Sequence, residues 1–439
     1  MAKYQKYAEY QDSGVEWLGE IPKSWQVKKL KYLCKVTTGS KDTVNAVEDG
    51  KYPFFVRSQT VERINSIGAD CEAVLTAGDG VGVGKVYHYY KGKFDFHQRV
   101  YMLYDFGTVT GRFVYYYLSS NFYKVALEGN AKSTVDSLRL PQFLNFEFSL
   151  PTVKEQNHVV DFLDHETAKI DTLIAKQEKL IELLKEKRQA VISHALTKGL
   201  NPNAPMKDSG VEWLGEVPES WEVRQLRYLG TCQNGINIGA EYFGSGSPFI
   251  SYGDVYRNPE LPSKFEGLVQ STENDRKIYS LKRGDVLFTR TSETIEEIGF
   301  SSTCLTDVEN ATFAGFLIRF RPLEAKLLPE YSKFYFRNLL LRAFFVKEMN
   351  LVTRASLSQE LLKKLPVMLP SIEEQERISD FLRDKDQVFN RLINRSNEQI
   401  ILLKERRTAL ISAAVTGKID IRNWQHPNQK NKADVELSA

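Results

Sequence analysis

The sequence is poor in the features that mark metal-binding, secreted and membrane proteins. Its 439 residues include only four cysteines, and because these are scattered without a C-x-x-C pair, neither a zinc site nor a disulfide framework is predicted. They are Cys34, Cys71, Cys232 and Cys304. No stretch approaches the roughly 18 apolar residues of a membrane helix, and the N-terminus lacks the apolar core of a signal peptide. We therefore expect a cytoplasmic protein that does not contact membranes.

An excess of charge of one sign is also missing. The chain carries 59 lysines and arginines against 56 aspartates and glutamates, a formal net charge of +3. This balance excludes a protein that binds nucleic acid or membranes along its whole surface, so any nucleic-acid interface must be local. Hydrophobic residues make up 42% of the sequence, and the length allows about three domains of roughly 150 residues.

The glycine-rich segment Gly78–Lys85 lacks the residues of a phosphate-binding loop. A P-loop would need glycine where Asp79 stands and serine or threonine where Val86 stands, and the spacing of a dinucleotide-binding loop fails as well. We therefore expect a turn in which two backbone segments approach closely. Segment Lys282–Arg290, which repeats the Gly-Asp pair at Gly284, is expected to be its counterpart in the second half of the chain.

Other catalytic constellations are missing too. A DNA methyltransferase would need an Asn/Asp-Pro-Pro-aromatic loop, which neither Asn201–Asn203 nor Asn258–Glu260 matches. Asp307 with Glu324 only imitates a metal-binding carboxylate cluster, and the six histidines form no His-x-x-x-His pair. The sequence therefore predicts no catalytic residue, no metal site and no cofactor bound by this chain.

The chain is built from two copies of a shared frame. Asp12–Trp25 reads DSGVEWLGEIPKSW and Asp208–Trp221 reads DSGVEWLGEVPESW. A second repeat begins at Leu150, where LPTVKEQNHVVDFLD is answered at Leu369 by LPSIEEQERISDFLR. The offset grows from 196 to 219 residues between the two repeats, so two inserts of different length and unlike sequence lie within the shared frame.

Each copy of the second repeat predicts one long helix with an apolar seam. Pro151 and Pro370 suit a helix start, and apolar residues follow at heptad spacing. One heptad position is filled by Leu163, Ile170, Leu184 and Val191 in the first copy and by Leu382, Phe389, Leu403 and Leu410 in the second. Leu173/Ile174 and Leu392/Ile393 supply the other position. Since neither helix has a neighbour in sequence, we expect them to pair as an antiparallel coiled coil of about 66 Å.

The inserts read as mixed α/β domains. Short β-rich runs such as Tyr52–Val56, Lys85–Tyr89 and Phe316–Phe320 alternate with glycine clusters, and one apolar helix is expected in each insert, at 112–127 and 330–346. The expected organisation is a globular region over 1–150, a helical region over 151–200, a second globular region over 201–369, a second helical region over 370–422 and a polar tail over 423–439.

The expected loops of both inserts are rich in side chains that contact DNA. Arginine, glutamine and asparagine read base edges, and lysine, serine and threonine contact phosphates. In the first insert the candidates are Arg57, Ser58, Gln59, Lys85, Lys91, Lys93, His97, Gln98, Arg99, Lys132, Ser133 and Arg139. In the second they are Asn234, Asn237, Tyr252, Asp254, Arg257, Asn258, Arg290, Thr291 and Arg354.

This layout resembles the DNA specificity (S) subunits of type I restriction-modification systems. The likeness is carried by the two L-P-x-x-x-E-Q segments at Leu150 and Leu369, by the two Gly-Val-Glu-Trp-Leu-Gly-Glu boxes, and by Trp25 and Trp221 at the start of each insert. The resemblance implies that 1–150 and 201–369 are target-recognition domains, each reading half of a bipartite site on double-stranded DNA. The helices would act as spacer and as docking surfaces for two modification subunits.

The same resemblance implies a subunit without an active site. S-adenosylmethionine would belong to the methyltransferase subunits, and ATP and Mg²⁺ to separate restriction subunits. Two other functions remain open from the residues alone: a coiled-coil scaffold with two protein-binding domains, and a self-contained DNA methyltransferase or endonuclease, against which the missing motifs argue.

Overall fold

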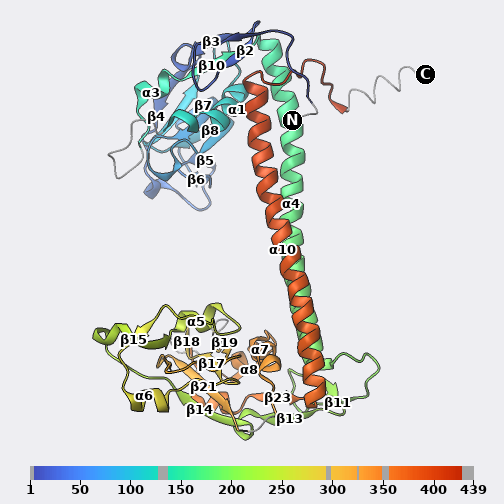
Figure 1. Ribbon diagram of the computed structural model, residues 1–439. Helices are drawn as coiled ribbons and strands as arrows, with labels where there is room; N and C mark the ends of the chain where they lie inside the picture. Colours follow the sequence, from blue (N-terminus) through green and yellow to red (C-terminus); the bar gives the residue numbers. More distant parts are fainter. Residues whose placement is uncertain (1–3, 127–136, 293–297, 324–325, 349–354, 428–439) are drawn as a thin grey trace, which may run out of the picture. The chain divides into compact units, whose positions relative to one another are not determined.

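The computed structural model describes residues 4–126, 137–292, 298–323, 326–348 and 355–427. The chain folds into two units, one made of residues 1–178 with 397–439 and the other of residues 179–396. The two long helices, α4 (Val153–Lys198) and α10 (Ile372–Val415), run through both units (Figure 1). None of the helices in the described part of the chain combines the length and apolarity needed to cross a bilayer.

The first unit is an α/β domain packed on parts of both long helices. Its strands are β1 (Tyr10–Asp12), β2 (Glu20–Pro22), β3 (Gln26–Lys29), β4 (Lys35–Thr38), β5 (Tyr52–Phe55), β6 (Glu62–Ile64), β7 (Ala69–Ala77), β8 (Tyr87–Phe96), β9 (Val100–Tyr104) and β10 (Glu147–Leu150). Its short helices are α1 (Gly111–Asn121), α2 (Tyr123–Ala126) and α3 (Leu140–Leu144). Six strands form one sheet in the order β4-β9-β7-β8-β5-β6, and α1 packs on β7 and β8.

The second unit repeats this plan with other lengths. Its strands are β11 (Met206–Asp208), β12 (Glu216–Pro218), β13 (Glu222–Gln225), β14 (Gly230–Asn234), β15 (Phe243–Ile250), β16 (Leu268–Val269), β17 (Val286–Thr289), β18 (Thr291–Ser292), β19 (Ser301–Thr303), β20 (Thr312–Phe313), β21 (Leu317–Pro322), β22 (Ala355–Ser356) and β23 (Pro366–Leu369). Its helices are α5 (Tyr252–Arg257), α6 (Glu273–Ile278), α7 (Pro329–Arg337), α8 (Leu341–Glu348) and α9 (Gln359–Lys363).

The main sheets of the two units share one topology despite their unlike sequences. The second sheet has the order β14-β21-β17-β19, which corresponds to β4-β9-β7-β8 in the first. Each unit has one further strand that pairs in parallel with the segment just before β9 or its equivalent β21. In the first unit β5 pairs with the end of β8, and in the second unit β15 pairs with β20. The predicted mixed α/β architecture with an internal repeat is confirmed.

The shared frame builds equivalent small sheets in each unit. The box around Gly14 forms the pair β1–β2, and the box around Gly210 forms β11–β12. Strand β3, after Trp25, pairs with β10, just as β13 pairs with β23 after Trp221. Both tryptophans are buried. The start of each insert is therefore anchored to the strand, β10 or β23, that directly precedes a long helix.

Within each unit the long helices run antiparallel, as predicted. In the first unit Arg407 of α10 pairs with Asp171 near the start of α4, at 2.8 Å and 3.3 Å. In the second, Arg188 near the end of α4 pairs with Asp386 near the start of α10. Arg407 is the repeat equivalent of Arg188, and Asp171 is that of Asn390, since each pair differs by the offset of 219. Arg188 also donates to Asn390 at 3.1 Å, so this contact between the two helices occurs in both units.

The predicted seam residues differ in burial along these helices. Leu163, Ile170, Leu382 and Leu410 are buried, and Leu184, Val191, Phe389 and Leu403 are half-buried. At the second heptad position Ile174 and Ile393 are half-buried in the seam, whereas the adjacent Leu173 and Leu392 are exposed.

The expected insert helices are present but interrupted. The first expected helix breaks between α1 and α2 at Phe122, and the second breaks between α7 and α8, where Asn338 takes an extended backbone conformation. Apolar patterning alone cannot show such a break, because both pieces bury their apolar side chains in the same core.

Candidate nucleic-acid interface

Three loops of the first unit meet at Asp79. The Arg57 guanidinium, after β5, lies 2.7 Å from one Asp79 oxygen, and the Arg99 guanidinium, before β9, lies 3.0 Å from the other. The Arg57 and Arg99 side chains are 39% and 57% exposed, against 21% for Asp79. The carboxylate therefore orients two arginine forks at the surface while leaving further N–H donors free to meet a base edge or a phosphate.

The glycine-rich segment forms a tight turn beside this cluster. Gly80 and Gly84 have φ values of +75° and +70°, which favour glycine. A side chain at Gly82 would place its Cβ 2.5 Å from the Arg57 carbonyl oxygen, and one at Gly84 would lie 3.0 Å from Ala126. The predicted close backbone approach is confirmed, and the turn supports the arginine cluster.

His97, Gln98 and Ser58 build the loops around this cluster. His97 is only 2% exposed, and its Nδ1 accepts a hydrogen bond from the Arg99 backbone N–H at 2.9 Å. Burial lowers the pKa of His97, against the opposing attraction of Asp42. The Gln98 amide donates to Asp42 at 2.8 Å and the Ser58 hydroxyl to the Thr60 carbonyl at 3.1 Å.

The other candidates of the first insert have different surroundings. Gln59, Lys85 and Arg139 are exposed on loops that lead into or out of the same edge of the sheet. Lys91 and Lys93 are exposed on β8, opposite Glu72 and Asp70 on β7. Lys132 and Ser133, with Arg354 of the second insert, lie outside the described residues.

The second unit gathers its candidates at the equivalent edge of its sheet. Arg290 directly follows β17, as Gly78 follows β7, and its backbone N–H donates to the Phe316 carbonyl at 2.9 Å. Asn237 lies beside Gly315, where an added Cβ would be only 1.9 Å from its side-chain oxygen. Asn234 ends β14, and its side-chain amide lies 3.0 Å from that of Gln359.

The expected counterpart of Asp79 in the second insert was wrong. Gly284 and Asp285 precede β17 rather than follow it, so they lie at the opposite end of the strand. Asp285 is 1% exposed and accepts two hydrogen bonds from Arg321, at 2.7 Å and 2.6 Å. The shared Gly-Asp pair suggested the wrong loop of the second insert, because equivalent loops can be identified only from the order of the strands.

Four of the remaining five candidates lie on or next to helix α5 and are partly used by its own structure. Asp254 accepts hydrogen bonds from the backbone and side chain of Ser251 in a capping box. Asn258 donates to the Asp254 carbonyl at 2.9 Å, and the Tyr252 ring stacks on Tyr256. Arg257 folds back over Gly253, and Thr291 begins β18 beside Arg290.

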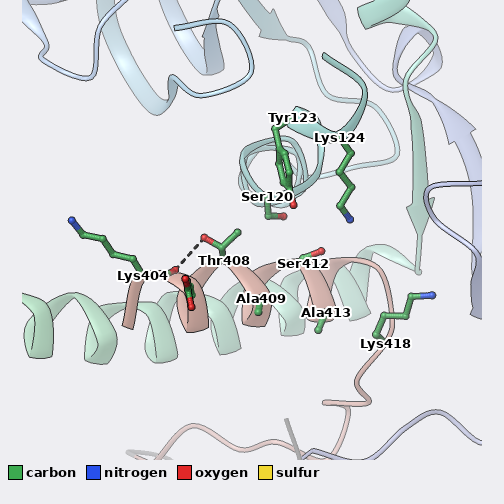
Figure 2. A pocket seen from close by; sticks show the side chains of 10 residues that line it. Ser120, Tyr123, Lys124, Lys404, Thr408, Ala409, Ser412, Ala413 and Lys418 are labelled. Carbon is green, nitrogen blue, oxygen red and sulfur yellow. Dashed lines mark hydrogen bonds between the residues drawn. The ribbon is translucent and has the colours of Figure 1, made fainter. Parts of the chain in front are cut away.

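A groove in the first unit lies between the domain and helix α10 (Figure 2). Ser120, Tyr123 and Lys124 line it from the domain. The Lys124 ammonium group donates to Asn121 at 3.1 Å, and that of Lys418 donates to the Glu20 carbonyl at 2.6 Å. Burial lowers the pKa of Lys124, helped by the nearby Lys418. Lys418, which follows α10, therefore ties the end of that helix to the shared frame at Glu20.

The sequence profile of the "Type I restriction modification DNA specificity domain" matches residues 22–183 and 218–402. The chain belongs to this family. Among its curated relatives, the EcoDI specificity subunit of Escherichia coli is 25% identical, over 93% of this chain and 92% of the relative. The MjaVIII specificity subunit of Methanocaldococcus jannaschii is 23% identical, over 92% and 95%.

Solved structures agree with this specificity-subunit fold. The HsdS subunit from Thermoanaerobacter tengcongensis matches with a TM-score of 0.51 and 14% identity, covering 91% of this chain and 98% of that one. A chain from a study of complex assembly in the type I R-M system matches with a TM-score of 0.67 and 14% identity, covering 90% and 98%. As a specificity subunit, the chain is a non-catalytic component of a type I restriction-modification system.

Proposed function

We propose that this subunit recognises a bipartite DNA site, with one half-site read by each sheet edge described above. In this proposal residues 1–150 and 201–369 are the recognition domains. The observation that carries it is the placement of unlike polar clusters, around Asp79 and around Arg290, at equivalent edges of two sheets with one topology. Two similar scaffolds with different reading groups suit a target with two different halves.

Exchange of one insert tests this modular reading. Residues 25–150 are replaced by the corresponding insert of another specificity subunit, and methylated adenines are mapped in cells that carry the complex. We expect one half of the methylated sequence to change while the other half stays. A change in both halves, or in neither, would contradict the proposal.

Point variants give a finer test of the same reading. Arg99→Ala should weaken binding by about 1–3 kcal/mol and relax recognition of one half-site, and Asn237→Ala should do so for the other. Lys23→Ala, which removes an exposed pair with Glu9 in the repeated frame, is the matched control and should leave both halves unchanged. Binding is measured at several salt concentrations, because phosphate contacts make it salt-dependent.

The long helices also carry a surface suited to partner subunits. Among the exposed large apolar side chains on them, six lie one residue before a seam position and are between 41% and 56% exposed. They are Leu173, Leu180, Leu183, Val388, Leu392 and Leu402. Each directly precedes a seam residue, which for Leu180 is the half-buried Ile181. In an antiparallel pair the residues that precede the seam point to the same face of both helices. In the first unit the resulting apolar stripe consists of Leu173 and Leu402, and in the second it consists of the other four residues.

The stripe is repeated and does not compete with the recognition domain. Leu173 and Leu402 in the first unit correspond, through the offset of 219, to Leu392 and Leu183 in the second. The domain instead contacts the opposite face, where Asp164 directly follows the seam residue Leu163 and accepts from Arg112 at 2.8 Å. Two stripes that share this pair of equivalent leucines suit two copies of one partner, which in this family would be the modification subunits.

Charge placed on the stripe tests this docking. Leu173→Glu with Leu402→Glu should weaken assembly with the modification subunits while leaving the melting temperature nearly unchanged, because both side chains are exposed. Assembly is followed by light scattering on mixed, purified subunits. The partners would supply S-adenosylmethionine, ATP and Mg²⁺ chemistry in the cytoplasm, where the DNA is. Unchanged assembly of the double variant would exclude this face.

A further inference from the structure

A buried glutamine at the start of α4 holds the start of the domain helix α1. The Gln156 side chain is 1% exposed. Its Oε1 accepts from the Thr110 backbone N–H at 3.0 Å, and its amide donates to the Thr108 and Pro151 carbonyls, both at 3.1 Å. Thr110 is the N-cap of α1, so one side chain ties the first turn of that helix to the first turn of α4.

The equivalent glutamine makes the same three contacts in the second unit. Gln375 accepts from the Leu328 N–H at 2.9 Å and donates to the Lys326 and Pro370 carbonyls at 2.8 Å and 3.0 Å. Leu328 is the N-cap of α7. Thr108–Thr110 and Lys326–Leu328 share no side chain, so each glutamine binds backbone alone and can hold inserts of unlike sequence in the same way.

The far end of each domain helix is held by the other long helix. Asn121, the last residue of α1, accepts from the Ser412 hydroxyl of α10 at 2.7 Å. Asn338, the C-cap of α7, accepts from the Ser193 hydroxyl of α4 at 2.9 Å. Each domain helix is therefore pinned at one end to α4 and at the other to α10, which fixes its direction relative to the helix pair.

We propose that Gln156 and Gln375 are positioning residues for DNA recognition. By fixing each recognition domain on the helix pair, they set the accepted gap between the two half-sites, without touching DNA themselves. This inference rests on the proposed function. The glutamate before each glutamine supports the same joint, because Glu155 accepts from the Trp25 indole at 3.2 Å and Glu374 from the Trp221 indole at 3.0 Å.

The test measures gap preference in the assembled complex. Wild type, Gln156→Met and Gln375→Met are each assembled with their modification subunits. Binding is measured to duplexes that carry the mapped target with its own gap, or with a gap one base pair shorter or longer. Methionine keeps the side-chain length but loses all three hydrogen bonds. We expect each variant to lose about tenfold of the preference for the natural gap, with less change in affinity for the natural duplex itself.

A matched control separates positioning from general destabilisation. Leu75→Ala creates a cavity in a buried cluster of the first domain that holds no residue of α1, α4 or α10, and should lower the melting temperature but keep the gap preference. Ser412→Ala removes the pin at the other end of α1 from a partly buried site and should relax the gap even if the glutamine variants fail to fold. Wild-type gap preference in the folded variants would overturn the proposal, whereas a wild-type complex without a bipartite site would instead refute the proposed function.

Discussion

The same substitution at two aspartates should have opposite consequences. Asp285→Asn breaks a pair in which the carboxylate is 1% exposed, bonded twice to Arg321 and once to the Lys282 backbone N–H at 2.8 Å. Breaking a buried pair costs about 3–5 kcal/mol. Because the Arg321 side chain keeps 25% of its exposure, we take the lower end, about 3 kcal/mol, which corresponds to a loss of roughly 6–12 °C in melting temperature for a unit of this size.

Asp79→Asn should cost far less stability but disturb DNA binding. Its arginine partners are solvent-exposed, so the pairs contribute about 1 kcal/mol or less. Thermal unfolding of the purified chain gives the stability of each variant, and hydrogen exchange of β17 and β7 assigns the loss to a unit. DNA binding of the complex gives the functional effect. Equal losses of stability, or a larger loss for Asp79→Asn, would refute the assignment of Asp285 as structural and of Asp79 as part of the reading edge.

Three further predictions concern the burial of His97, of the cysteines and of Gly82. Because burial lowers the pKa of His97, the unfolded chain binds the proton more readily, so stability should fall as pH drops from 7 to 5, and His97→Gln should flatten that dependence in urea titrations. Cys34 and Cys304, whose pKa burial raises to about 12, should resist iodoacetamide in the native state while Cys71 reacts faster, as peptide mass mapping would reveal. Gly82→Ala should cost about 1–3 kcal/mol in urea unfolding, since its Cβ would overlap the Arg57 carbonyl.

The two-copy architecture could be predicted from the sequence, because it depends on an internal repeat and on the periodic spacing of apolar residues. The 219-residue offset located both long helices, and the heptad spacing located their seam. The choice between adjacent apolar residues, such as Leu173 and Ile174, could not be made in advance, since it depends on where the partner helix lies. The exposed leucines that result are the basis of the proposed docking surface.

The common topology of the two inserts could not be predicted. Strand order depends on backbone pairing. Different sets of side chains can support the same backbone pairing equally well. Equivalent positions such as Ala77 and Thr289, each the last residue of a central strand, therefore carry no shared sequence, whereas the accidental Gly-Asp match at Gly284 pointed to the wrong loop. The arginine pair around Asp79 was predicted only as separate candidates, because the loops that join it are far apart in the chain.

The role of the Glu-Gln pair also could not be predicted from the sequence, which shows it only as part of the two repeated L-P-x-x-x-E-Q segments. In the structure the glutamine binds only backbone atoms of the insert, and the glutamate binds the tryptophan of the frame. Such a joint does not depend on which side chains the insert has at that contact. It requires only that the insert contains a helix that starts and ends at the right places. The sheet edge that we propose to contact DNA can therefore vary in sequence without altering this joint. This separation of holding residues from reading residues gives a physical reason why one frame can carry two inserts as different as those of this chain.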